Sequence, residues 1–125
     1  MITRYQIVRG APAAALPKGV RQDTRKHTRH PLRPSVAMVA AYLAAPGSTA
    51  WRRLAREYRA LIAARFAADR APFDALAELA RTQDVHLGCN CPTRLNPSVE
   101  RCHTWLALEF LRERYPDLDV RMPRT

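Results

Sequence analysis

"DVHLGCNCPTRLNPSVERCHTWLALEF", residues 84–110, is the stretch of sequence that decides the fold. Its first eight residues alternate, so that Val85, Leu87, Cys89 and Cys91 fall on one side of an extended chain, which predicts a strand. A loop follows, and then a long helix is predicted over about 99–115, ended by Pro116. The segment "LDVRM", 118–122, alternates again and predicts a last strand. Strand, helix and strand in this order predict a βαβ unit with parallel strands.

Upstream of this unit, the chain is predicted to supply further strands and three more helices. "RYQIVRG", 4–10, is typical of a short strand, and the basic loop 11–34 contains a possible second strand near 20–25. Helices are predicted over 36–45, 50–68 and 72–81, and the expected N-terminal caps are Ser35 for the first and Ser48 or Thr49 for the second. The sequence therefore predicts a single α/β domain over 1–125, a small three-layer domain with a short, mostly parallel sheet flanked by helices.

Length and composition are those of a soluble globular protein. The chain has 125 residues, of which 47% are hydrophobic and 26% charged. It contains no apolar run of the roughly 20 residues that a membrane span requires, and its N-terminus does not resemble a signal peptide. Its three cysteines are an odd number, which argues against a disulfide framework. We therefore expect a cytoplasmic protein with reduced thiols and no membrane partner.

Positive charge is concentrated near the N-terminus. Residues 1–34 hold eight Lys or Arg against one acid, Asp23, and so carry +7 of the net charge of +10. Such a local excess attracts phosphates and other polyanions. No glycine-rich phosphate loop, dinucleotide-binding fingerprint or known nucleic-acid module is present, so the expected partner is an anionic ligand, a nucleotide or a nucleic acid, without further definition.

All three cysteines and one histidine fall within fifteen positions, 89–103. Cys89 and Cys91 are placed at the carboxyl end of a predicted strand, and Cys102 and His103 in the first turns of the next helix. Ligands of open α/β sheets bind at this edge, and a helix N-terminus stabilises a thiolate. Three interpretations stay open: a reactive or ligand-contacting thiol–imidazole site, a metal site, and ordinary core.

The metal interpretation has the right ligands but an unfavourable spacing. Three thiolates and an imidazole, from Cys89, Cys91, Cys102 and His103, match the ligand set of a structural zinc site. Adjacent residues on a helix, however, point about 100° apart, so that one of Cys102 and His103 is expected to miss the ion.

The basic loop "RQDTRKHTRHPLRP", 21–34, is expected to fold over this edge of the sheet. In that arrangement Arg25, His27 and Arg29 would hold phosphate, and further ligand contacts would come from Cys89, Asn90 and Cys91. Cys102 and His103 would do thiol or acid–base chemistry. Asp23 either takes part in catalysis or forms an ordinary ion pair with Arg25 or Lys26.

The same residues carry a resemblance to two families of α/β proteins. "VHLGCNCPT" and "NPSVERCHTWLALEFL" resemble the "LLC-x-E…CHR" ending of domain-of-unknown-function family 488, and more closely the "LGC-x-C…CH" ending of family 4326. "DTRKHTRHPL", 23–32, is similar to the "DVR…P" segment of family 488, and "REYRAL" to its middle helix. Thr104 stands where that family has arginine, and the loop before Cys102 is longer.

The resemblance implies a small three-layer α/β domain with a shared pocket, in which Asp23 and Arg25 are the acid and the arginine, and Cys102 and His103 the Cys-His pair. It implies no activity. From the residues themselves we predict binding, with processing left open, of a phosphate-bearing ligand at a Cys/His pocket rimmed by arginines. The alternative is a non-enzymatic zinc-binding protein. Whether the protein is an enzyme, and its oligomeric state, stay undetermined.

Overall fold

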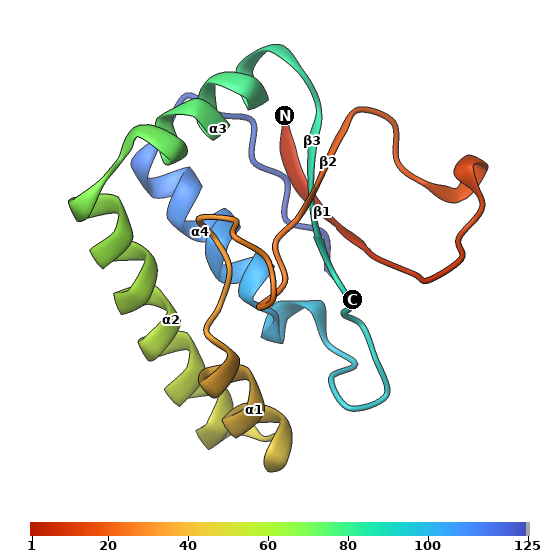
Figure 1. Cartoon of the computed structure of the whole chain (residues 1–125), viewed down its shortest axis with the longest axis vertical. Coiled ribbons are helices and arrows are strands. Elements are labelled where there is room, and N and C mark those ends of the chain that lie inside the picture. The colour runs from red at the N-terminus through yellow and green to blue at the C-terminus, as the bar shows by residue number, and fades with distance from the viewer. Residues whose placement is uncertain (125) are drawn as a thin grey trace.

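The computed structural model describes residues 1–124 and shows a three-stranded sheet with four α-helices (Figure 1). The strands are β1 (Ile2–Gln6), β2 (Val20–Asp23) and β3 (Val85–Cys89), and the α-helices are α1 (Val36–Ala44), α2 (Ser48–Ala68), α3 (Ala71–Thr82) and α4 (His103–Arg114). Two short 3₁₀ turns, η1 (Ala13–Ala15) and η2 (Val99–Arg101), complete the regular structure. The predicted α/β fold class is confirmed.

All strand pairs are parallel, in the order β1-β3-β2. The central strand β3 pairs with both neighbours, so that Val85 lies opposite Ile2 on one side and Val20 on the other. The second strand expected near 20–25 is therefore present. Because parallel strands end at one edge of the sheet, Gln6, Asp23 and Cys89 lie together at the carboxyl edge.

The predicted last strand over 118–122 is wrong in extent but correct in direction. Val120 makes an isolated parallel bridge with Ile2, on the outer side of β1. The amide of Ile2 donates to the carbonyl of Asp119 (2.9 Å), and the amide of Arg121 donates to the carbonyl of Ile2 (2.9 Å). The next donor in this parallel ladder would be the amide of residue 123, and Pro123 has no N–H, which limits the pairing to this bridge.

The three helices predicted before β3 exist within one or two residues of their predicted ends, but one predicted cap is wrong. Ser35 caps α1, since its side chain accepts from the amide of Met38 (3.1 Å). The residue before α2 is Gly47, without a side-chain cap, and Ser48 is already helical. The Ser48 hydroxyl instead accepts a hydrogen bond from Arg101 (3.0 Å) and so links α2 to the loop that precedes α4.

The helix predicted over 99–115 is interrupted at Cys102. This residue is extended, with φ −121° and ψ 150°, and separates η2 from α4. Cys102 is therefore the residue that precedes the first turn of α4 rather than a residue within a helix. This break decides the geometry of the site described below.

The helices gather on one side of the sheet (Figure 1). Helix α4 packs against β1 and β3, α2 packs against α4, and α1 packs against α2. Phe66 of α2, Phe73 of α3 and Phe110 of α4 meet at steep angles, with ring centroids 5.4–5.8 Å apart, and close one end of the core. In residues 1–124 no helix is long and apolar enough to cross a bilayer.

Candidate functional site

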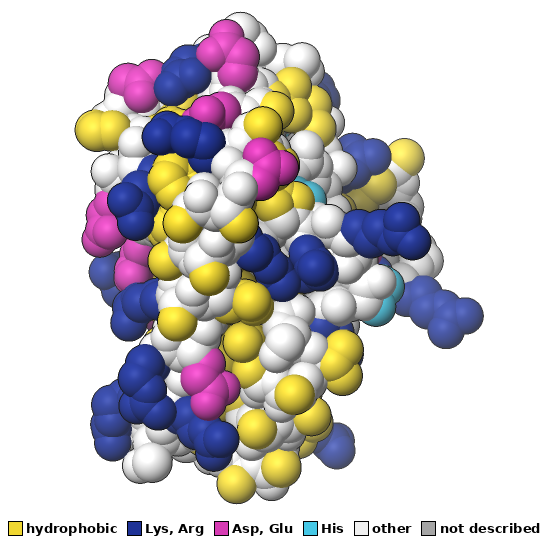
Figure 2. Space-filling model, turned by 60° about the vertical axis from the view of Figure 1, so that its left-hand side comes forward, with side chains coloured by type: hydrophobic (Ala, Val, Ile, Leu, Met, Phe, Trp, Pro, Cys, Tyr) yellow, Lys and Arg dark blue, Asp and Glu magenta, His cyan; other side chains and the backbone are white. Residues whose placement is uncertain are grey.

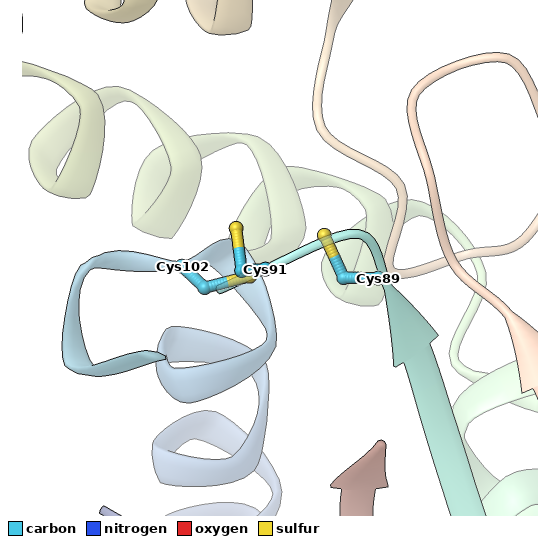
Figure 3. Close-up of side chains that lie close together, drawn as sticks. All are labelled: Cys89, Cys91 and Cys102. Atoms are coloured by element: carbon cyan, nitrogen blue, oxygen red, sulfur yellow. The ribbon is translucent and has the colours of Figure 1, made fainter. Parts of the chain in front are cut away.

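Three sulfur atoms meet at the carboxyl edge of the sheet (Figure 3). Cys89 ends β3, Cys91 lies in the loop that follows, and Cys102 directly precedes α4. Their Sγ atoms all lie within 4.8 Å of one another, and the three residues are free thiols, at most 9% exposed. Such a set of soft ligands can hold a metal ion or sustain thiol chemistry.

His103 faces two of these sulfurs. Its Nδ1 lies 3.8 Å from the Sγ of Cys89 and 3.8 Å from the Sγ of Cys102. Cys102 is extended, so the rotation of about 100° between neighbouring helical residues does not apply to this pair. The expectation that one of Cys102 and His103 would miss a metal ion stays a prediction, and His103 is not in the group of ligand atoms that all lie within 4.8 Å of one another. We call Cys89, Cys91, Cys102 and His103 the thiol floor.

Thr24 fixes the tautomer of His103. The Thr24 hydroxyl, fully buried, donates its single proton to the carbonyl of Gly88 (2.9 Å). The same oxygen lies 2.8 Å from Nε2 of His103 and must accept there, so Nε2 carries the ring proton. The Nδ1 lone pair is then directed at the sulfurs, where it can accept a thiol proton or bind a metal.

The thiols of the floor differ in acidity. Hydrogen bonds from the thiols of Cys89 and Cys91, together with the Thr104 hydroxyl 3.2 Å away, lower the pKa of Cys102 well below its ordinary value. The pKa of Cys91 is raised far above its ordinary value, first by its hydrogen bond to Cys102 and then by that to Cys89. Of these two thiols, Cys102 is the more acidic and Cys91 the less acidic.

Asn96 braces the loop that carries Cys91. Its side-chain amide donates to the Sγ of Cys91 (3.2 Å) and to the carbonyl of Arg101 (2.9 Å), and it accepts from the Tyr42 hydroxyl (3.1 Å). Asn96 is 6% exposed, so these bonds form inside the protein. The loop between β3 and α4 is thereby tied to α1 and held in one shape.

A cavity of about 190 Å³ lies over the thiol floor. One wall is apolar and comes largely from α1, with Val39, Tyr42 and Leu43. Four basic side chains lie around the cavity, and we call them the basic rim: Arg25, Lys26, His27 and Arg101. The site thus joins a thiol–imidazole floor to a cationic opening.

The basic loop supplies only part of the rim that the sequence predicts. Arg25 and His27 line the cavity, as does Asn90, whose side-chain oxygen accepts from Arg25 (3.0 Å). Arg29 is exposed and is not among the lining residues. Asp23 is also outside the lining.

Asp23 holds the rim in place. It forms the expected ion pair with Arg25 (2.8 Å), and its hydrogen bonds from Arg25 lower the pKa of the Asp23 carboxyl. His27 lies 3.8 Å from the same carboxylate. Asp23 therefore orients Arg25 and His27 without lining the cavity itself.

Several site residues escape sequence analysis. Thr24, Asn96 and Thr104 are ordinary polar residues whose importance comes from burial beside the floor. Arg101 carries no motif, and Arg4 lies 85 positions from the nearest cysteine. For Arg4 a weak signal existed. In a strand that begins at Ile2, side chains two positions apart point to the same face, so Arg4 shares the buried face of Ile2.

Comparison with known proteins identifies the family. The family model DUF488-N3a, described as the active DUF488-N3 subclade, matches residues 4–115. No curated protein and no solved structure matches the chain. The match spans both segments on which the resemblance to family 488 rested, the "DTRKHTRHPL" loop and the cysteine–histidine ending. The chain belongs to the DUF488 family, in its DUF488-N3 subclade.

Proposed function

We propose that the cavity binds a small phosphate-bearing ligand, a nucleotide or the terminal nucleotide of a nucleic acid, and processes it with Cys102 and His103. The observation that carries the proposal is the cavity itself, in which a cationic rim opens onto a floor of convergent thiols and an imidazole. A concave site with a few convergent polar groups and a perturbed thiol pKa is the expected form of a ligand-processing site. The description of the matching subclade as active is in keeping with an enzyme.

The rim has donors left for an anion. Arg25 uses Nε and one proton on each terminal nitrogen for Asp23 and Asn90, which leaves two N–H groups free. These two groups belong to a guanidinium that Asp23 already orients, so little side-chain entropy is lost when a phosphate binds. Lys26 and Arg101 add positive charge around the same opening.

The size and the walls of the cavity limit the ligand. At about 190 Å³ it is smaller than the roughly 300–1,000 Å³ of pockets that enclose drug-sized molecules. A mononucleotide fits this limit if its phosphate stays at the rim and its sugar or base contacts the apolar wall of Val39 and Leu43. Charge on the helical side of the molecule is interspersed rather than gathered, since Lys and Arg lie among Asp and Glu on that face (Figure 2). An extended nucleic-acid surface on that face is therefore not part of the proposal.

The floor supplies the chemistry. Cys102 is the nucleophile, because its pKa is lowered, and His103 Nδ1, 3.8 Å from its sulfur, exchanges the proton. Asp23 acts through Arg25 as a positioning residue rather than by contact with the ligand.

A matched pair of variants tests the binding part. We expect Arg25→Ala to weaken binding of adenosine 5′-monophosphate by about tenfold or more, because a charge-assisted hydrogen bond to phosphate contributes about 1.5–3 kcal/mol. Arg29→Ala removes the same charge from the same loop, but away from the cavity, and is expected to change binding less than about twofold. Isothermal titration calorimetry at two salt concentrations measures both.

Equal losses of nucleotide affinity in Arg25→Ala and Arg29→Ala would mean that only the net charge of the protein determines binding. The binding proposal would then be wrong, as it would be if the wild-type protein bound neither the nucleotide nor inorganic phosphate at millimolar concentration.

Zinc binding is the second candidate, favoured by the sulfur geometry. Sulfurs bound to one tetrahedral zinc lie about 3.8 Å apart, so the observed limit of 4.8 Å needs only a small adjustment. Thr24 also orients His103 in the way that a hydrogen-bond acceptor behind a metal-bound histidine orients its ring. A zinc protein would purify with about one equivalent of metal, and chelation would lower its melting temperature by more than about 10 °C. Under the thiol proposal we expect elemental analysis to find less than about 0.1 equivalent and chelation to leave the melting temperature unchanged.

A further inference from the structure

Two tight turns border the cavity. In the 25–28 turn, the amide and the hydroxyl of Thr28 both donate to the carbonyl of Arg25 (3.0 and 2.7 Å). In the 93–96 turn, the amide of Thr93 donates to the carbonyl of Asn96 (2.9 Å), and the amide of Asn96 donates to the Thr93 hydroxyl (3.1 Å). Arg25, Thr93 and Asn96 all line the cavity, so the tip of each turn lies beside it.

Each tip carries a cation that has no counter-ion. Lys26 in the first turn and Arg94 in the second are exposed. Within residues 1–124 neither forms an ion pair, whereas Arg25 pairs with Asp23. Two cations at the border of one cavity, contributed by loops far apart in the sequence, attract negative charge beyond that which Arg25 can bind.

An apolar side chain lies next to one of these cations. Leu95, at the tip of the 93–96 turn, is 63% exposed, and in residues 1–124 only Val8 and Val36 are other large hydrophobic residues with comparable exposure. A cation followed by an exposed apolar side chain suits a ligand in which phosphates alternate with sugars and bases. A nucleic-acid strand has this composition, and an acidic peptide does not.

We propose that the ligand is the end of a single-stranded nucleic acid, and that the 25–28 and 93–96 turns bind the part of the strand next to the terminal nucleotide. This inference rests on the proposed function, because the terminal nucleotide occupies the cavity. Lys26 and Arg94 bind the phosphate that follows, and Leu95 contacts the second sugar or base. The contacts are to the backbone and to apolar surface, so they select a strand without selecting its sequence.

The size of the cavity favours a single strand over a duplex. At about 190 Å³ the cavity is smaller than the pockets that enclose a drug-sized molecule, and a base pair is too large to enter it. A nucleotide at an unpaired end enters without the free-energy cost of unpairing.

The test compares adenosine 5′-monophosphate with the 5′-phosphorylated adenosine tetranucleotide by isothermal titration calorimetry at several salt concentrations. We expect the tetranucleotide to bind wild-type protein at least about fivefold more tightly at low salt. Its affinity should also fall more steeply with salt, by about 0.7 in the logarithmic slope for each added phosphate contact. A tetraglutamate peptide is expected to bind at least about tenfold more weakly than the tetranucleotide.

Arg94→Ala isolates the contribution of the second turn. We expect it to weaken tetranucleotide binding about fivefold and to lower the salt slope by about 0.7, while binding of adenosine 5′-monophosphate changes less than about twofold. Arg112→Ala removes the same charge from an exposed position near the end of α4, at the far end of that helix from Cys102, and is expected to change neither affinity by more than about twofold. Both positions are exposed, so both variants are expected to fold.

The two proposals fail in different ways. If the tetranucleotide binds no more tightly than the mononucleotide, or if Arg94→Ala and Arg112→Ala weaken it equally, the strand inference is wrong while the mononucleotide site stands. Equal binding of tetraglutamate would mean that the turns attract any anionic chain, which also overturns the inference. If neither the nucleotides nor inorganic phosphate bind at millimolar concentration, the proposed function itself is wrong.

Discussion

Gly19→Ala is expected to destabilise the protein by about 3 kcal/mol or more, while Gly10→Ala costs about 1–2 kcal/mol. Both glycines have positive φ, +74° at Gly10 and +107° at Gly19, so both substitutions carry backbone strain. They differ in the space available. A Cβ at Gly10 meets nothing within 4 Å, whereas a Cβ at Gly19 would lie 2.4 Å from the carbonyl oxygen of Asp84.

The difference in unfolding free energy between the two variants measures the effect of the close approach at Gly19. The carbonyl of Asp84 accepts from the amide of Val20 (2.8 Å), and this bond begins the pairing of β2 with β3. A side chain at Gly19 pushes these strands apart at the point from which β2 runs toward Thr24 and Arg25. Urea unfolding of both variants measures the effect. Equal losses in Gly10→Ala and Gly19→Ala would show that the close approach to Asp84 contributes nothing to stability.

The sheet could be predicted from sequence where side chains alternate over several residues. In residues 85–89, Val85, Leu87 and Cys89 alternate with a histidine and a glycine, and β3 is found there. The segment 118–122 alternates equally well, but it forms a single bridge, because pairing also needs backbone N–H groups and Pro123 has none. Alternation identifies an extended chain without stating how much of it is paired.

The site could be predicted in part because strand ends and helix starts coincide in parallel α/β units. From that rule alone, Cys89, Cys91 and Cys102 are expected to meet at the carboxyl edge of the sheet. The rule does not reveal that Cys102 is extended, which depends on the loop 92–101 and its brace by Asn96. The expectation that one of Cys102 and His103 would miss a metal ion rested on a continuous helix, and of the two only Cys102 belongs to the group whose ligand atoms all lie within 4.8 Å of one another.

Arg4 and Arg29 show the limits of charge as a signal. Both belong to the basic N-terminal third, yet Arg29 is exposed away from the cavity and Arg4 is buried under the floor. The sequence shows that Arg4 is charged. Whether it is buried depends on which face of the five-residue strand β1 its position occupies. The ends of such short strands are uncertain by about one or two residues. A shift of one residue moves every side chain of a strand to the other face of the sheet.

Cys102 is expected to be the first thiol of the folded protein to be alkylated at pH 7, and Cys91 the last. An ordinary thiol with a pKa near 8.5 is only about 3% ionised at this pH, and a thiol whose pKa is lowered has more of the reactive thiolate. Part of the gain in rate is lost, because a more acidic thiolate is a weaker nucleophile. The raised pKa of Cys91 keeps that thiol protonated and unreactive over the same range.

The direction of the pKa shift fixes the pH dependence. Because the pKa of Cys102 is lowered, its alkylation rate should fall less steeply between about pH 8.5 and 6.5 than that of an ordinary thiol, which slows by about 50-fold. Cys102→Ser should abolish this less pH-dependent phase, whereas Cys91→Ser, which changes the neighbouring thiol by the same atom, should retain it. Stopped-time alkylation with peptide mass spectrometry distinguishes the three sites. If the fast phase instead follows Cys91, or if it slows with pH as a free thiol does, the floor is not organised to hold a thiolate at Cys102, and the chemistry assigned to that residue is wrong.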